Sequence, residues 1–319
     1  MAQRLQKKGR RASIVWRVCL PLMAAAACGD GSLIVLGQRE PRAFRFDPPA
    51  VLAELSAPAK TDNPTLSADL LEIYFTSERN GIPADIWRAE RSDSSEPFGG
   101  PQLVDELNST RTETSPIVSP DALTFWLASD RPGGLGDLDV WSSTREARGE
   151  AWVAPRNVPA LSSSSKDLPR LPGQHDRVMP LASDRDKRGY YQLYFANRSA
   201  PSEAFDTPEL VRELSDLEAS LVDGFLSDDG LTLFYVRGPL FGPADLYVAS
   251  RRALSEPFGY ASALTDLNTS SDERDPWWSA DGRLLFFSSD RSGQYEIYVA
   301  RVRPEALDGG AEDPEAGTP

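Results

Sequence analysis

Five copies of one unit of about 53 residues fill most of this 319-residue chain. The clearest marker of the unit is an aromatic residue in a short apolar segment, and the five markers are Trp87, Trp141, Tyr194, Tyr247 and Tyr298. Successive markers are 54, 53, 53 and 51 residues apart. So constant a period indicates a repeat architecture, in which each unit buries its apolar face against its neighbours.

Each unit has the pattern of four short strands. In the fifth unit, the turn Ser279-Ala280-Asp281-Gly282 separates a first strand from an apolar second strand, and a Ser-Asp-Arg motif at 289–291 precedes the aromatic third strand. A more polar fourth strand follows the third in the other units. Such turn residues favour tight reversals, and no 3.6-residue periodicity indicates helices. We therefore predict an all-β fold, a five-bladed β-propeller of four-stranded antiparallel blades.

The two ends of the repeat predict how the ring closes. Residues 46–55 resemble the fourth-strand segment at 257–267, yet they precede the first unit, and the fifth unit stops after its third strand near Val302. We expect this N-terminal strand to complete the last blade, which leaves no open sheet edge. The propeller then spans residues 46–303, and the acidic residues 304–319 are predicted to form a disordered tail.

The N-terminus predicts export. Residues 1–27 contain six basic residues, no acidic residue, and an apolar stretch too short to span a bilayer of about 30 Å. This pattern is typical of a signal peptide. The sequence Ala25-Ala26-Ala27-Cys28-Gly29 resembles the lipobox of bacterial lipoproteins, which implies lipidation of Cys28 and a linker at 28–45. Alternatively, Cys28 is an incidental small residue in a signal peptide that is cleaved elsewhere.

Charge and cysteine content limit the possible partners and the cellular location of the chain. The net charge is −14, and removal of the six basic residues in 1–27 makes it −20. Such a body repels phosphate, so we predict no nucleic-acid partner, whereas cations, basic proteins and neutral sugars remain possible. Cys19 and Cys28 are the only cysteines, so no disulfide bond is expected after residue 28. The predicted location is the bacterial cell envelope, facing the periplasm or at the surface.

The order of motifs closely resembles the WD40-like repeat of TolB-type propellers over residues 46–303. The first, second and fifth units match best. The third unit lacks the turn motif at 172–175, and the fourth replaces Ser-Asp-Arg with Val236-Arg237-Gly238. The resemblance implies an envelope scaffold that binds proteins. The extra domain and the sixth blade of the periplasmic relative are not apparent, so its partners are not implied.

The sequence predicts no catalytic residues, no cofactor and no metal site. His175 is the only histidine, and it lies in the degenerate turn of the third unit. There is no Gly-x-Ser-x-Gly elbow, His-Glu-x-x-His helix or phosphate-binding glycine loop. The turn aspartates and the arginines of the Ser-Asp-Arg motifs recur from unit to unit, so we interpret them as structural.

The departures from the repeat are more informative, and several of them fall on the first strands, which line the channel of a propeller. An apolar column (Leu66, Val118, Leu171, Leu226 and Trp278) is expected in the blade cores. Strict alternation then predicts the channel residues to be Asn63, Thr65, Ser115, Ile117, Leu168, Arg170, Asp223, Phe225, Asp275 and Trp277. Among these, Arg170, Asp223, Phe225, Asp275 and Trp277 are the candidate ligand-binding residues.

Aromatic rings beside carboxylates suit a sugar or a cation, and paired carboxylates can hydrolyse glycosides. Alternatively, these side chains plug the channel, with Asp223 and Asp275 solvated at its mouth. We predict a non-catalytic cell-envelope lipoprotein whose propeller is a protein-interaction scaffold. The alternative is a propeller that binds or hydrolyses carbohydrate at the channel.

Overall fold

The structure of this chain, a computed structural model, describes residues 44–239 and 242–303. The predicted signal peptide, Cys28, most of the linker and the tail at 304–319 lie outside these residues and stay predictions. Within the described ranges, no helix has the length and apolar character needed to cross a membrane.

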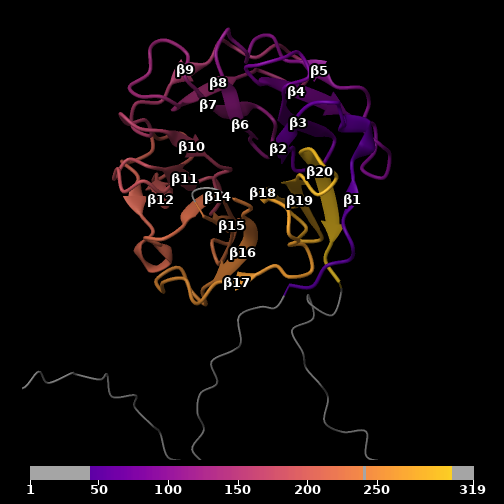
Figure 1. The fold of residues 1–319 in the computed structure, drawn as a ribbon. Helices are drawn as coiled ribbons and strands as arrows, with labels where there is room; N and C mark the ends of the chain where they lie inside the picture. Colours follow the sequence, from indigo (N-terminus) through magenta and orange to yellow (C-terminus); the bar gives the residue numbers. More distant parts are fainter. Residues whose placement is uncertain (1–43, 240–241, 304–319) are drawn as a thin grey trace, which may run out of the picture. The chain divides into compact units, whose positions relative to one another are not determined.

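Over these ranges, twenty strands form five four-stranded antiparallel sheets around a central axis (Figure 1). Blade one contains β2 (Thr61–Leu66), β3 (Glu72–Ser77), β4 (Asp85–Glu90) and β5 (Gln102–Leu103). Blade two contains β6 (Glu113–Val118), β7 (Thr124–Ser129), β8 (Asp139–Thr144) and β9 (Arg156–Asn157). Blade three contains β10 (Asp167–Pro169), β11 (Val178–Ser183), β12 (Gln192–Asn197) and β13 (Glu209–Leu210). The predicted all-β, five-bladed propeller is confirmed.

The last two blades complete the ring. Blade four contains β14 (Ser220–Leu226), β15 (Thr232–Gly238), β16 (Asp245–Ser250) and β17 (Ser262–Ala263). Blade five contains β18 (Glu273–Trp278), β19 (Leu284–Ser289), β20 (Glu296–Arg301) and, from the other end of the chain, β1 (Ala50–Val51). Two short 3-10 turns, η1 (Ala53–Leu55) and η2 (Arg212–Leu214), precede blades one and four.

The ring closes as predicted, because the N-terminal strand completes the last blade. Ala50 lies opposite Val299 in an antiparallel pair, and Phe46 forms a further bridge with Val302. Figure 1 shows β1, at the indigo end of the colour scale, beside the yellow β20. The pairing covers the outer edge of β20, which would otherwise be a site for unwanted strand addition.

The repeated motif residues have structural roles, as predicted. In blade five, Arg291 donates from Nη2 to Glu273 Oε1 at 3.0 Å and from Nε to Ser289 Oγ at 3.0 Å. Glu273, on β18, is fully buried and lies directly opposite Ser289 on β19. The turn residue Asp281 accepts from Ser279 Oγ at 2.6 Å and from the backbone N–H of Arg283 at 3.1 Å. These bonds join the first two strands and stabilise the turn between them.

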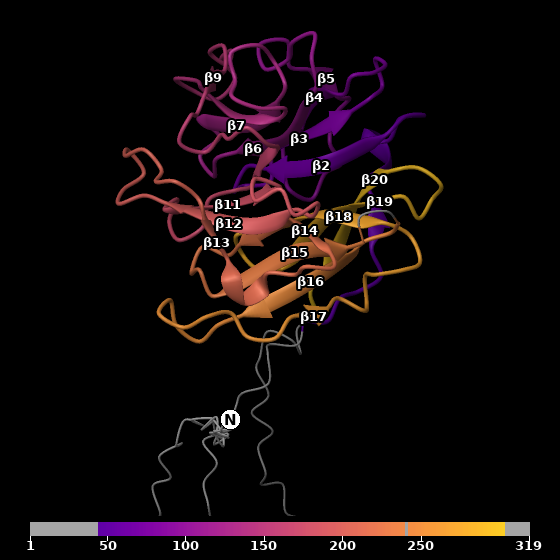
Figure 2. The ribbon, with the colours of Figure 1, turned by 60° about the vertical axis from the view of Figure 1, so that its left-hand side comes forward.

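The turns between the first and second strands gather on one face, which we call the turn face (residues 67–71, 119–123, 172–177, 227–231 and 279–283). The backbone N–H of Ala68 donates to the carbonyl of Pro120 at 3.1 Å, so two of these turns are in direct contact. Figure 2 shows the inner strands crossing the ring, with connections at both of their ends.

Candidate binding site at the central channel

Arg170 crosses the centre of the ring. It follows β10 in blade three, and its Nη2 atom contacts Asp223 Oδ1 in blade four. The same nitrogen donates to Asp275 Oδ1 in blade five at 3.0 Å and to Asn63 Oδ1 in blade one at 3.3 Å. One guanidinium from the third blade therefore joins the first strands of three other blades. The structure brings the predicted charged residues together in one network.

A backbone bulge directs these acceptors inward. Asn63, Ser115, Asp223 and Asp275 have φ values of 55°, 49°, 56° and 56°, and the strand register shifts at each of them. Asn and Asp tolerate this left-handed conformation better than most residues do. Blade three shows no such register shift, and Arg170 occupies the channel there instead. The acceptors and their common donor thus come from different local structures.

Asp275 is the most perturbed acid of this network. Only 6 % of the residue is exposed, and its Oδ2 accepts the backbone N–H of Asn63 at 3.1 Å. Burial raises the pKa of Asp275 to about 8, with a further increase from the Asp223 carboxylate, although Arg170 acts in the opposite direction. One guanidinium cannot balance two buried carboxylates, so we expect Asp275 to hold a proton near neutral pH.

The space left in the channel is small. The cavity there has a volume of about 20 Å³, enough for roughly one water molecule and far too small for a sugar ring. Its walls are Asn63, Pro64, Thr65, Pro116, Ile117, Arg170, Leu171, Phe225, Asp275, Pro276 and Trp277. Of the predicted channel residues, Ser115, Leu168 and Asp223 are not among them. The bulges break the expected alternation, and for this reason three prolines line the cavity.

The expectation that Asp223 and Asp275 are solvated at a mouth is wrong. They are 4 % and 6 % exposed, because Arg170 and the surrounding apolar side chains cover them. A carboxylate that is buried in this way needs a cation or a proton to remain stable. The network therefore closes the channel instead of opening it to solvent.

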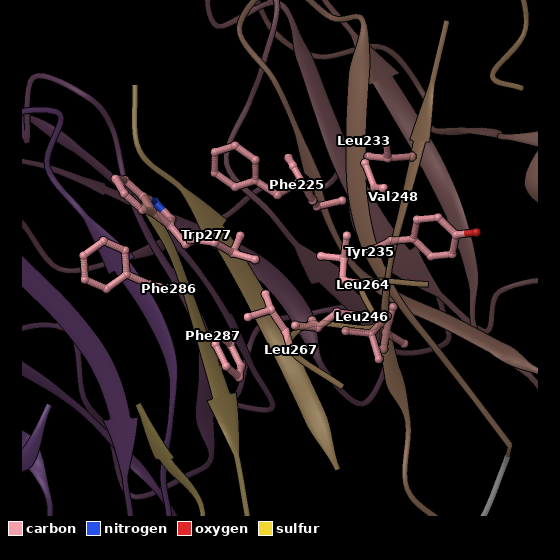
Figure 3. Close-up of a cluster of buried hydrophobic side chains, with 14 of the residues drawn as sticks. Phe225, Leu233, Tyr235, Leu246, Val248, Leu264, Leu267, Trp277, Phe286 and Phe287 are labelled. Atoms are coloured by element: carbon pink, nitrogen blue, oxygen red, sulfur yellow. The ribbon is translucent and has the colours of Figure 1, made fainter. Parts of the chain in front are cut away.

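Phe225 and Trp277 lie between this small cavity and the turn face. Their ring centroids are 6.0 Å apart at an interplanar angle of 67°, and both residues are buried (Figure 3). The Nε1 atom of Trp277 has no hydrogen-bond partner among the described residues. An unpaired buried N–H costs about 1–3 kcal/mol. A water molecule or a ligand that accepts this hydrogen bond would remove that cost.

On the other side of these rings is a larger hollow, which we call the mouth pocket. It has a volume of about 510 Å³, within the usual range for ligand pockets. Its apolar walls are Phe44, Leu66, Ala68, Pro120, Leu171, Pro172, Gly173, Phe225, Leu226, Phe234, Trp277, Trp278 and Ala280. Turn residues from all five blades surround it. Phe225 and Trp277 line both spaces, so the predicted aromatic residues face a real pocket.

Trp278 belongs to this pocket, although the sequence predicted it in the blade core. The residue is partly exposed, and its ring stacks on Phe234 with centroids 4.6 Å apart and an angle of 21°. Phe44 contacts the same ring edge-on at 5.2 Å. Leu171, from the same predicted column, also lines the pocket. Two successive tryptophans, at positions where the other units have smaller residues, were the feature of the sequence that could have indicated this pocket.

The rim of the mouth pocket is acidic. Asp228, Asp229 and Asp281 contribute to its wall. His175, the only histidine, is exposed and pairs with Asp228 through Nδ1 and Oδ2 at 2.8 Å. Asp229 and Asp281 each use one oxygen to stabilise their own turn. The pocket therefore combines an apolar floor with a negatively charged border.

No family model matches this sequence, and no curated protein matches it. Among solved structures, it is similar to an endo-arabinase from Bacteroides thetaiotaomicron, with 12% identity, a TM-score of 0.57, and coverage of 81% of this chain and 98% of the other. It is also similar to an arabinofuranosidase catalytic domain from Coprinopsis cinerea, with 12% identity, a TM-score of 0.53, and coverage of 82% of this chain and 98% of the other. The match to TolB from Acinetobacter baumannii has 16% identity, a TM-score of 0.45, and coverage of 78% of this chain and 57% of the other.

At these identities the similarities concern the fold alone. In fold, the chain is a five-bladed β-propeller of four-stranded blades. It spans 57% of the length of the TolB structure from Acinetobacter baumannii. Because a fold shared at these identities does not determine an activity, the activity has to be argued from the site itself.

Proposed function

We propose that this chain is a non-catalytic recognition module of the bacterial cell envelope, held at a membrane by a lipid on Cys28. Its propeller binds a partner protein at the mouth pocket. The observation that supports this proposal most is the bonding of Arg170 to both channel carboxylates. An acid pair that is neutralised inside the fold serves to hold the blades together and not to transform a substrate.

Glycoside hydrolysis would need a different arrangement. Two carboxyl groups must flank the scissile bond, at a separation of about 5 Å or more, with the sugar between them. Asp223 and Asp275 contact the same guanidinium nitrogen, and the cavity beside them has a volume of only about 20 Å³. Both observations weigh against hydrolysis at the channel and favour binding at the mouth pocket.

The chemistry of the mouth pocket suggests the kind of partner. Its floor is apolar and aromatic, its rim carries Asp228, Asp229 and Asp281, and the whole chain has 48 acidic and 34 basic residues. A protein segment with one large apolar side chain between basic residues would match both features. Burial of such a side chain is worth about 1.5–3 kcal/mol, and opposite charges accelerate association.

Site-specific photo-crosslinking in intact cells tests the proposed surface. One probe replaces Ala280, an exposed residue in the wall of the mouth pocket, and the control probe replaces Leu135, which is 59 % exposed in the β7–β8 connection. We expect a protein adduct from position 280 and none from position 135. No adduct at 280, or the same adduct at both positions, would refute the proposed binding surface.

The anchor is tested separately by Cys28→Ala. The proposal requires that this variant leave the membrane fraction after cell lysis while the wild-type chain remains in it. A variant that stays membrane-bound rules out the lipid anchor. This result would leave the crosslinking result at Ala280 unaffected, so the two parts of the proposal can fail independently.

Carbohydrate binding at the mouth pocket is the second candidate, favoured by the unpaired Nε1–H of Trp277 beside several aromatic rings. A sugar hydroxyl can accept this hydrogen bond while its C–H face packs on a ring. Thermal-shift screening of glycans with the wild type and with Trp277→Phe separates the candidates. A glycan that stabilises only the wild type would support carbohydrate binding, and no stabilisation by any glycan would remove it.

A further inference from the structure

In four of the five blades, an arginine covers the aromatic marker of the third strand. The guanidinium carbon lies 4.9 Å from the Trp87 ring, 5.4 Å from Trp141, 5.1 Å from Tyr194 and 4.9 Å from Tyr298. These arginines are Arg79, Arg131, Arg185 and Arg291. Each of them also donates to the carbonyl of a leucine in the preceding connection (Leu55, Leu107, Leu161 and Leu267) at 2.6–2.9 Å. The fold thus contains four copies of one guanidinium-binding arrangement.

Blade four has lost the arginine of this arrangement. Strand pairing sets Tyr235 opposite Tyr247, just as it sets Phe287 opposite Tyr298 in blade five. Counting forward from these rings, Arg237 stands where blade five has Ser289, and Pro239 stands where it has Arg291. Leu221 lies opposite Arg237, at the place of Glu273. All three members of the ion-pair motif are therefore replaced together.

The receiving groups of the arrangement remain. The Tyr235 and Tyr247 rings stack at 5.9 Å and 28°, close to the 5.7 Å and 24° of Phe287 and Tyr298. Leu214 ends η2 as Leu55 ends η1, which places its backbone at the position of the carbonyl acceptor. Figure 3 shows Tyr235 at the edge of the apolar cluster, with its hydroxyl directed away from the other labelled side chains.

A hollow of about 450 Å³ lies where the arginine is missing, and we call it the blade-four slot. Its walls are Glu213, Leu214, Ser215, Asp216, Leu221, Tyr235, Arg237, Tyr247, Phe258, Gly259, Tyr260 and Ala261. None of these residues lines the mouth pocket. The slot is therefore a separate site, and its role does not depend on the function proposed above.

The charges around the slot nearly balance one another, and its aromatic rings favour a cation. Arg237 is paired with Asp216 through Nε at 2.9 Å and Nη2 at 2.8 Å. Glu213 also lies in the wall, where its Oε1 accepts the backbone N–H of Phe258 at 3.3 Å. The wall thus contains two carboxylates and one guanidinium. Arg251, whose guanidinium carbon lies 4.6 Å from the Phe258 ring, interacts electrostatically with Glu213. The exposed ring faces of the slot are therefore what attracts a further cation.

We propose that the blade-four slot binds an arginine side chain of a partner protein, which restores in trans the guanidinium that the other blades supply themselves. The planar guanidinium stacks on the tyrosine pair and donates to acceptors in the slot wall. Tyr260, which is 95 % exposed at the border of the slot, is placed to contact the partner backbone around that side chain.

The test uses two small probes on the purified full-length chain. N-acetyl-arginine methylamide carries the guanidinium, and N-acetyl-citrulline methylamide is its neutral counterpart of nearly the same shape. We expect the arginine probe to bind at least tenfold more tightly in NMR titrations, with shifts at slot residues. Equal affinity for the two probes would overturn the proposal.

A second test uses a variant in which an arginine of the chain itself occupies the slot. Leu221→Glu, Arg237→Ser and Pro239→Arg together recreate the motif of blade five, and we expect at least a tenfold loss of arginine-probe binding with no loss of thermal stability. If this triple variant does not fold, Tyr247→Leu removes the ring and should give the same loss. Trp277→Phe in the mouth pocket should leave probe binding unchanged. Undiminished binding by a folded slot variant refutes the assignment.

Discussion

Nη2 of Arg170 lies 3.0 Å from Oδ1 of Asp275, and this bond joins the third and fifth blades across the centre of the ring. Both residues are less than 10 % exposed. One side chain thus connects two blades that are not neighbours in the ring. Its consequences can be measured, because the strength of a buried ion pair is most apparent when one partner is removed.

Arg170→Met should destabilise the fold by about 3–5 kcal/mol, because it leaves Asp223 and Asp275 buried without their cation. Urea unfolding followed by tryptophan fluorescence measures this change. Arg188→Ala is the matched control, since Arg188 forms an ion pair with Asp186 at the surface, and its loss should cost no more than about 1 kcal/mol. Equal effects of the two substitutions would show that the central network does not hold the ring together.

The raised pKa of Asp275 predicts how stability depends on pH. The folded chain keeps this proton up to about pH 8, whereas the unfolded chain releases it near the ordinary value of 3.8. Between these values the folded state binds more protons, so stability should fall as the pH rises, by at most about 1.4 kcal/mol per pH unit for one proton.

Asp275→Asn removes this titration while keeping the shape of the side chain. Its unfolding free energy, measured at several values between pH 5 and pH 8, should decline less than that of the wild type. Asp47→Asn, at an exposed carboxylate paired with Arg303, should follow the wild-type curve. Parallel curves for Asp275→Asn and the wild type would contradict the interpretation that Asp275 is protonated in the folded network.

Phe46→Ala tests ring closure. Phe46 is 1 % exposed, forms a bridge with Val302, and contacts the Trp278 ring edge-on at 6.3 Å. Truncation of a buried phenylalanine should cost about 3–5 kcal/mol. Val51→Ala on the neighbouring β1 is the control, because Val51 is 39 % exposed and should lose less than about 1 kcal/mol. A small effect at both positions would mean that closure contributes little to stability.

Blades four and five should respond differently to loss of their arginines. Arg291→Ala leaves the fully buried Glu273 without its cation, and we expect a cost of about 3 kcal/mol. Arg237 pairs with Asp216 near the surface, so Arg237→Ala should cost less than about 1 kcal/mol. Chemical unfolding of both variants measures the difference. Similar losses would show that Arg237 has taken over the structural role of the missing motif.

The period of the aromatic markers was sufficient to predict the blade number, and the resemblance of residues 46–55 to the segment at 257–267 predicted the closing strand. These features depend on burial and on repetition, which a sequence displays directly. The turn aspartates and motif arginines were also interpretable, since the same short-range bonds recur from blade to blade. The predicted positions of Arg170 and Asp275 were correct to the extent that both lie in the channel.

The bonding of the channel residues was less accessible to prediction. A bulge at Asn63, Asp223 and Asp275 changes which side chains face inward, and strict alternation cannot anticipate it. The pairing of Arg170 with two acids depends on residues 53 and 105 positions away. The mouth pocket was missed for a related reason, because Trp278 faces it only in the assembled ring.

The pairing of Ala50 with Val299 also sets an order of events. The two residues are 249 positions apart, so a strand that emerges early from the ribosome must wait for almost the last one. Contacts between such distant positions form late, after the costly closure of a long loop. If the chain is exported as its N-terminus predicts, the ring remains unclosed during translocation. It closes only after the last blade has been translocated.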